Sequence, residues 1–237
     1  MILETPPIWF RSVCRKNGLV IDNGQVDQME RYVSLLLEWN KKINLISRKG
    51  EENVWSSHIL HSASILFTLK LVDNPAVLDL GSGGGLPGIP LKILLPRSTF
   101  RLIDSTQKKI TAVQDIITRL GLQGVETSWG RAEELSRQSN LSSHFDYIVA
   151  RAVAPLDDLV RWSAPFLQRV GQERSVVPGS PTLQPPALVA LKGGDIQTEI
   201  AKTKRMKEVR SIEVADLIFS GSEDLPSTDK KIVVVKF

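Results

Sequence analysis

Residues 77–90 decide the fold of this chain and read Val-Leu-Asp-Leu-Gly-Ser-Gly-Gly-Gly-Leu-Pro-Gly-Ile-Pro. The apolar run 76–80 predicts a buried strand, and it leads directly into a turn with five glycines: Gly81, Gly83, Gly84, Gly85 and Gly88. Residues without side chains let backbone amides approach a ligand and adopt φ values that other residues resist. Pro87 and Pro90 suit the first turn of a following helix. The stretch therefore predicts a nucleotide-type pocket at the carboxyl end of a parallel strand.

Two classes of nucleotide site compete for this turn. The dinucleotide motif G-x-G-x-x-G fails when counted from Gly81, because its sixth position is Leu86; counted from Gly83 it fits but begins late after the strand. The motif alone is weak in any case. Asp79 discriminates better, because a carboxylate there would repel a pyrophosphate. It suits a ligand with an ammonium group and no phosphate, such as S-adenosylmethionine (AdoMet), and the spacing resembles the first motif of AdoMet-dependent methyltransferases.

Size and composition indicate one substantial domain with an extension, since the chain has 237 residues. No apolar run approaches the ~18 residues that a membrane span needs, and the N-terminus lacks a signal-peptide pattern. The lone Cys14 excludes an internal disulfide and a cysteine zinc cluster. We therefore expect a cytoplasmic protein that does not contact a membrane. The formal net charge of +4 is compatible with a polyanionic partner.

The N-terminal third is predicted to be helical. A first helix starts at Thr5 with proline in its first turn and stops at Asn17-Gly18. A second helix carries an apolar face between Val26 and Leu37, and a third runs from about 52 to 69. We expect residues 1–70 to form a helical cap or extension, and residues 71–237 to form one compact methyltransferase domain.

From residue 76 onward, short apolar strands alternate with helices. Strands are expected at 76–80, 99–103, 124–128, 145–150 and 187–191, and helices at about 89–95, 107–120, 131–138, 157–168 and 195–207. This alternation predicts βαβ units with a parallel sheet. A strand near 208–217 and the closing run 231–237 follow each other without a helix, so they should pair antiparallel. The predicted class is α/β: a Rossmann-like class I AdoMet methyltransferase with a seven-stranded, mostly parallel sheet and an antiparallel terminal hairpin. Residues 171–186, rich in Pro, Ser and Gly, predict a long surface loop.

Candidate cofactor residues follow the second and third strands. Asp104 ends the second strand ~20 residues after the glycine turn, where an acidic group binds the ribose hydroxyls of an adenosine cofactor. Ser105 and Thr106 continue that edge. Asp104 acting only as a helix cap is the structural alternative. After the third strand, the backbone amide of Ala132 is expected beside the adenine ring, with Glu133 or Arg131 fixing the loop; an ordinary helix start is the alternative.

The fourth strand runs into Arg151, where methyltransferases place residues that face the substrate. The chain lacks the Asn- or Asp-Pro-Pro-aromatic tetrapeptide that holds an exocyclic adenine amine, and it lacks a nucleophilic cysteine for attack on a pyrimidine carbon. What remains is an acceptor that is already nucleophilic, such as guanine N7. No general base is then needed, so we predict no catalytic residue and attribute catalysis to positioning, which can contribute ~7–11 kcal/mol. Arg151 is expected to steer the base or the cofactor, or else to form a structural salt bridge.

Two basic stretches are typical of an RNA surface, although charge runs are usually solvated faces. The first is 39–49, and the second contains Lys202, Lys204, Arg205, Lys207 and Arg210. His58 and His61 lie one helical turn apart. Because the sequence offers no third ligand near them, we interpret them as packing residues, and we predict no metal site.

Six segments together resemble the ribosomal RNA small subunit methyltransferase G family, also called glucose-inhibited division protein B. They are Asn40-Lys-Lys-Ile-Asn-Leu45, Leu78-Asp-Leu-Gly-Ser-Gly-Gly-Gly-Leu-Pro-Gly-Ile-Pro-Leu91, Leu102-Ile-Asp-Ser105, Arg131-Ala-Glu133, Arg151-Ala-Val-Ala154 and Leu191-Lys-Gly193. The resemblance implies AdoMet-dependent methylation of guanine N7 in 16S rRNA, with 16S rRNA or the small ribosomal subunit as partner. By match of motif, it implies that the cofactor is bound by Gly81, Leu86, Asp104, Ser105, Thr106, Ala132, Glu133 and Arg151.

The sequence departs from the family at three places, which bear on substrate contacts more than on the cofactor. His61 stands where the family usually has Asp, the segment Asp104–Lys109 lacks the usual Gly-Lys-Arg ending, and the 171–186 loop is long. Two alternatives stay open: an AdoMet-dependent methyltransferase for another RNA or a small molecule, and a non-catalytic AdoMet-binding RNA partner. The small-molecule alternative would gain if neither basic stretch lined the pocket mouth. We expect a monomer.

Overall fold

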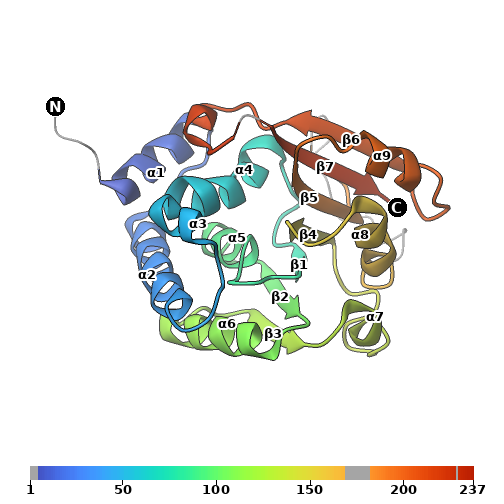
Figure 1. Cartoon of the computed structure of the whole chain (residues 1–237), viewed down its shortest axis with the longest axis horizontal. Helices are drawn as coiled ribbons and strands as arrows, with labels where there is room; N and C mark the ends of the chain where they lie inside the picture. The colour runs from blue at the N-terminus through green and yellow to red at the C-terminus, as the bar shows by residue number, and fades with distance from the viewer. Residues whose placement is uncertain (1–4, 169–181, 228) are drawn as a thin grey trace.

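A seven-stranded sheet forms the centre of the protein (Figure 1). The structure is a computed structural model, and it describes residues 5–168, 182–227 and 229–237, without the side chain of Lys49. The strand order is β3-β2-β1-β4-β5-β7-β6. The strands are β1 (Ala76–Leu80), β2 (Thr99–Asp104), β3 (Val125–Trp129), β4 (Tyr147–Arg151), β5 (Ala187–Gly193), β6 (Ser211–Asp216) and β7 (Lys230–Lys236). Most of the predicted 171–186 loop lies outside the described residues.

The first five strands run parallel, and β7 pairs antiparallel with both β5 and β6. Neighbouring residues of β1 point to opposite faces, so Val77 joins one apolar core and Leu78 the other. Burial on both faces explains why the central strands β1, β4 and β5 read as largely apolar runs in the sequence. The predicted parallel sheet with an antiparallel terminal hairpin is confirmed.

One face of the sheet is covered by the N-terminal helices together with the helices that follow β1 and β2 (Figure 1). These helices are α1 (Pro6–Lys16), α2 (Asn23–Asn40), α4 (His61–Thr68), α5 (Gly88–Leu94) and α6 (Gln107–Leu120). Helix α2 begins with a capping box in which the Asp22 carboxylate accepts from the Gln25 amide at 2.8 Å. Gly121 ends α6 with φ at +66°. The N-terminal helices thus share one hydrophobic core with this face of the sheet.

The other face carries α7 (Ala132–Leu135), α8 (Leu156–Ser163) and α9 (Gln197–Thr203) over a second apolar core. A short 3-10 turn, Ser222–Asp224, connects β6 to β7. Helices α7, α8 and α9 are each shorter than the range predicted from the sequence. None of the helices in the described ranges is long and apolar enough to span a membrane.

The predicted third helix, 52–69, is the clearest difference from expectation. In the structure this range holds a π-helical turn over Trp55–Leu60 that runs directly into α4, and a separate short helix, α3 (Arg48–Glu52), ends where the predicted helix was to begin. The apolar pattern is the same for a continuous helix, so the sequence did not reveal the wider turn. Because π-helical turns occur frequently at functional sites, the side chains on this turn are candidates for a functional role.

Candidate functional site

Backbone hydrogen bonds hold the glycine turn at the carboxyl end of strand β2. The backbone amides of Gly81 and Ser82 both donate to the Ile103 carbonyl at 2.9 Å, and the Gly83 amide donates to Oδ2 of Asp104 at 3.0 Å. The turn therefore lies at the carboxyl ends of β1 and β2, which is where open α/β sheets bind their ligands.

A cavity of about 220 Å³, which we call the glycine-turn cavity, opens beside this turn. Five of the predicted cofactor residues line it: Gly81, Asp104, Ser105, Ala132 and Glu133. The structure therefore brings together residues that follow three different strands. Val153 and Trp162 complete the wall, and the sequence analysis did not single them out.

The Asp104 carboxylate is held in place by two backbone amides. Oδ2 accepts from Gly83, and Oδ1 accepts from Thr106 at 2.8 Å. Asp104 is buried, with 8% of its surface exposed, and it faces the glycine-turn cavity. Each carboxylate oxygen has more than one acceptor site, so Asp104 retains capacity for two ligand hydroxyls.

Asp79 is fully buried beneath the turn. Its Oδ2 accepts from the Gly88 amide at 2.8 Å, an approach that a Cβ on Gly88 would block. Its Oδ1 has no hydrogen-bond partner among the described residues. Burial raises the pKa of this carboxyl to about 7, with the bond from Gly88 and the Arg151 charge acting in the opposite direction. A buried carboxylate oxygen without a partner is typical of a site that receives a positively charged or hydrogen-donating ligand.

Three of the predicted cofactor residues do not line the glycine-turn cavity. Leu86 is buried in the apolar core, and its amide donates to the Ser82 carbonyl at 2.9 Å. Thr106 lies just before α6 and donates its amide to Asp104. Arg151 lines a second cavity, described next.

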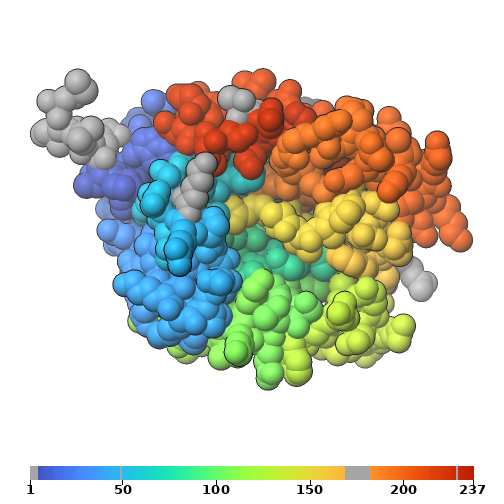
Figure 2. All heavy atoms as spheres, in the orientation of Figure 1, coloured from blue at the N-terminus to red at the C-terminus, as the bar shows by residue number. Residues whose placement is uncertain are grey.

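The second cavity, which we call the basic cavity, has a volume of about 590 Å³. Its cations are Arg151, Lys192 and Lys230, from β4, β5 and β7. Arg151 donates from Nη1 to the Ser57 carbonyl at 3.1 Å, and burial lowers the pKa of its guanidinium. Histidines of the π-helical turn and α4 form part of the wall. Figure 2 shows the teal atoms of the glycine-turn region set back between the blue N-terminal helices and the yellow segment that follows β4.

Helix α2 packs directly on the glycine turn. The Tyr32 hydroxyl, which is buried, donates to the Gly84 carbonyl at 2.9 Å. A Cβ on Gly84 would lie 2.7 Å from Cδ1 of Leu36, so a larger residue at this position would push α2 away. The N-terminal segment thus helps to define the shape of the turn, a contact between distant residues that local sequence patterns do not report.

The first basic stretch reaches the basic cavity at Ser47, and the adjacent Arg48 is exposed. Several of its members have structural partners: Trp39 donates to Asp115 at 2.7 Å, Lys42 pairs with Glu38 at 3.2 Å, and the side-chain oxygen of Asn40 accepts from the Leu45 amide at 2.7 Å. The cations of the second stretch are exposed and line neither cavity. In the described ranges, no group of three His, Cys, Asp or Glu side chains could hold a metal ion.

Comparison with known proteins identifies a single family. Residues 25–177 match the family model described as rRNA small subunit methyltransferase G. The ribosomal RNA small subunit methyltransferase G of Chlorobium luteolum is 42% identical over 196 residues, covering 83% of this chain and 74% of that protein. The protein of the same name from Chlorobaculum tepidum is 37% identical over 230 residues, covering 96% and 97% respectively.

Solved structures are similar in fold at low sequence identity. A precorrin-6y C5,15-methyltransferase from Geobacter metallireducens superposes with a TM-score of 0.53 at 14% identity, covering 82% of this chain and 92% of that one. Aeropyrum pernix fibrillarin, solved with natively bound S-adenosyl-L-methionine, gives a TM-score of 0.51 at 13% identity and 73% coverage of each chain. These likenesses show the Rossmann-like methyltransferase fold.

Proposed function

The chain belongs to the rRNA small subunit methyltransferase G family, and from this membership we propose that it transfers a methyl group from AdoMet to N7 of a guanine in 16S rRNA. The observation that carries the proposal is the convergence of Gly81, Asp104 and Ala132 on one cavity at the carboxyl ends of parallel strands. When bound, AdoMet supplies the methyl group from its sulfonium.

We assign cofactor binding to two groups of residues. Asp104 is suited to accept from the ribose hydroxyls, while Ser105, Ala132 and Glu133 border the space for the adenine. Gly81 brings its backbone against the same cavity. Leu86 and Thr106 would act indirectly, through the shape of the turn and through Asp104, and Arg151 would act from the opposite side near Asp79.

The residues present fit AdoMet better than a dinucleotide. Oδ1 of Asp79 lacks a partner among the described residues and lies under the glycine turn, so an ammonium group nearby would satisfy it. A pyrophosphate at the same place would meet a carboxylate instead of a cation. The buried Asp79 therefore supports a cofactor with an amino-acid end.

The reaction needs no general base, because guanine N7 carries its lone pair in the plane of the ring and holds no proton. The contribution of the protein is then to align the acceptor with the methyl donor, which can be worth ~7–11 kcal/mol. Membership of a family named for rRNA methylation supports an RNA acceptor over a small molecule. We further infer a monomeric cytoplasmic enzyme, with residues 1–70 as its helical extension and residues 71–237 as its methyltransferase unit.

The test is the product itself. The purified protein is incubated with AdoMet and either naked 16S rRNA or small subunits, and nuclease digests are analysed by mass spectrometry. We expect 7-methylguanine at one position. Calorimetry with AdoMet accompanies the assay: binding without methyl transfer to either substrate would favour the non-catalytic AdoMet-binding alternative.

A further inference from the structure

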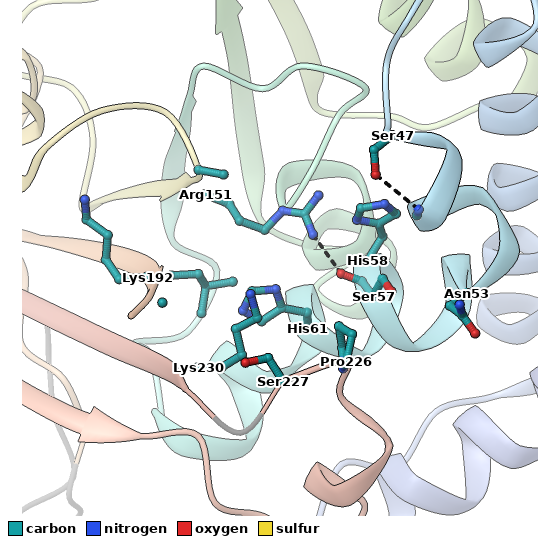
Figure 3. Close-up of a pocket in the computed structure, with 14 residues that line it drawn as sticks. Ser47, Asn53, Ser57, His58, His61, Arg151, Lys192, Pro226, Ser227 and Lys230 are labelled. Carbon is teal, nitrogen blue, oxygen red and sulfur yellow. Dashed lines mark hydrogen bonds between the residues drawn. The ribbon is translucent and has the colours of Figure 1, made fainter. Parts of the chain in front are cut away.

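The basic cavity contains two histidines that the proposed cofactor site does not use. His58 belongs to the π-helical turn and His61 to the first turn of α4, and both line the cavity. In Figure 3 their rings lie near the guanidinium of Arg151, whereas the Lys192 ammonium points away from them. Lys192 is occupied elsewhere, by Glu199 at 2.6 Å and by the Ala154 carbonyl at 2.8 Å.

Both rings have buried nitrogens without hydrogen-bond partners. These are Nδ1 and Nε2 of His58 and Nε2 of His61, and no group in the described ranges pairs with them. Leaving such an atom unpaired costs about 1–3 kcal/mol. Histidines that served only to pack the helices would be expected to hydrogen-bond to the backbone or to each other. Their partner is therefore expected to come from outside the chain.

Both rings are neutral at physiological pH. Burial lowers the pKa of each imidazole to about 3, and the nearby charges of Arg151 and Lys230 lower it further. A neutral imidazole has one N–H donor and one nitrogen acceptor. The two histidines therefore bring hydrogen-bond acceptors to the wall of the cavity beside the donors of Arg151. Because the unpaired nitrogens are buried, a ligand would reach them by turning the rings toward the cavity.

This mixture of donors and acceptors distinguishes a base from an anion. A phosphodiester of an RNA backbone accepts hydrogen bonds only, so it would leave the acceptor nitrogens of both histidines unpaired. The Watson–Crick edge of a guanine carries two donors, the N1–H and the N2 amino group, beside the O6 acceptor. Two imidazole nitrogens and one guanidinium match that edge in number and in kind, and a volume of about 590 Å³ leaves room for the nucleotide.

The basic cavity is also connected to the proposed cofactor site. Arg151 lies close enough to Asp79 for the carboxylate charge to act on the pKa of the guanidinium, and Asp79 contacts the glycine turn through the Gly88 amide. Two residues after Arg151, Val153 lines the glycine-turn cavity. Ala152, between them, lines the basic cavity with φ at +54°, a strained value for a residue other than glycine. One short segment therefore forms part of both walls.

We propose that the basic cavity is the pocket for the acceptor base, in which His58 and His61 accept hydrogen bonds from the edge of a guanine while Arg151 donates to its O6. The proposal rests on the proposed function and adds the position of the substrate. His58 and His61 are binding residues in this scheme and take no proton from the base.

Gly50 offers a second way to test the pocket without removing a histidine. A Cβ on Gly50 would overlap Nε2 of His58, so Gly50→Ala is expected to turn the His58 ring. The chain also contains a natural control. His144 is its third histidine, is exposed, and lines neither cavity.

The first experiment measures binding directly. The full chain is labelled with ¹⁵N-histidine, and NMR follows the three imidazoles during titration with guanosine 5′-monophosphate in the absence of AdoMet. The resonances of His58 and His61 should shift, and that of His144 should not. Inorganic phosphate is the matched probe for an anion site. If phosphate reproduces the shifts, or if the nucleotide produces none, the base pocket is wrong.

The second experiment compares His61→Phe, His61→Asn, Gly50→Ala and His144→Phe in the 16S rRNA assay, with calorimetry for AdoMet. His61→Phe should lower kcat/KM about tenfold or more, because the base loses a hydrogen-bond partner. His61→Asn should retain more activity, since its amide oxygen still accepts; Gly50→Ala should be impaired, and His144→Phe unchanged. AdoMet affinity should remain that of the wild type throughout. Full activity in both His61→Phe and Gly50→Ala would overturn the pocket, whereas absence of 7-methylguanine with the wild type would overturn the proposed function.

Discussion

Replacing Asp79 with Asn should make the cofactor-free protein more stable and impair its binding of AdoMet. Asp79 is fully buried, with one oxygen bonded to the Gly88 amide at 2.8 Å and the other unpaired in the described structure. Asn keeps the shape and the acceptor for Gly88 while removing the buried charge. The expected gain in stability arises because the substitution removes a buried charge whose Oδ1 has no hydrogen-bond partner in the described structure.

The size of the effect follows from the pKa of Asp79, which is raised from 3.8 to about 7. The difference of about three pKa units corresponds to ~4 kcal/mol. Since the folded state binds this proton more tightly, the penalty is absent below pH ~4, grows between pH ~4 and ~7, and is complete above that. Leaving the Asn amide nitrogen unpaired costs about 1–3 kcal/mol, so the variant should gain about 1–3 kcal/mol at pH 8.5.

The assay is urea unfolding of wild type and Asp79→Asn at pH 5, 7 and 8.5. His58 and His61 titrate in the opposite sense, because their pKa is lowered to about 3 in the folded state and stability gained from them rises with pH. The difference between the two proteins cancels these contributions and isolates Asp79. The exposed Asp27 supplies the matched control, Asp27→Asn, for which no change is expected.

The affinity of Asp79→Asn for AdoMet should fall, whereas its free energy of unfolding without ligand should rise. The cofactor ammonium would lose its carboxylate partner, so calorimetry should show weaker binding to Asp79→Asn even though the variant is more stable without ligand. The reasoning is refuted if the variant is less stable than the wild type at pH 8.5, or if the stability difference between the two proteins is the same at pH 5 and pH 8.5.

Three further variants test the glycine turn. Asp104→Ala should weaken AdoMet binding more than tenfold by calorimetry, since a hydrogen bond to a charged group is worth about 1.5–3 kcal/mol; unchanged affinity would remove Asp104 from the site. Gly81→Ala should cost about 1–2 kcal/mol from its φ of +73° alone, and more because its Cβ would lie 2.7 Å from Val153. Adding Val153→Ala should therefore recover only part of the lost thermal stability. Tyr32→Phe leaves the Gly84 carbonyl unpaired and should lower the free energy of unfolding by about 1–3 kcal/mol; an unchanged urea midpoint would contradict this.

The centre of the sheet could be predicted from the sequence because its central strands are buried on both faces. A strand such as 187–191 has no solvent-facing side, so it reads as an uninterrupted apolar run between Pro186 and Lys192. Helix ends were visible where they depend on local chemistry, as at Asn17-Gly18 after α1. The π-helical turn at 55–60 could not be predicted, because a wider turn and an ordinary one bury the same pattern of residues.

The site was predictable only where function imposes a spacing along the chain. Asp104 and Ala132 each follow a strand that ends beside the glycine turn, so their positions could be expected from topology. Val153 and Trp162 line the same cavity but belong to no motif, so their positions become evident only in the folded structure. The two histidines were interpreted as packing residues, because the sequence cannot report that a ring nitrogen will be buried without a partner.

The N-terminal helices help to shape the glycine turn and do more than cover one face of the sheet. The carbonyl of Gly84 is held by Tyr32, and the space that a side chain on Gly84 would need is filled by Leu36 of the same helix. The absence of a side chain at this glycine is therefore required by α2, whatever the ligand requires. Since α2 also fixes the turn under which Asp79 lies, cofactor binding and the packing of α2 should be coupled. AdoMet should then slow amide exchange in α2, although none of the residues lining the glycine-turn cavity belongs to that helix.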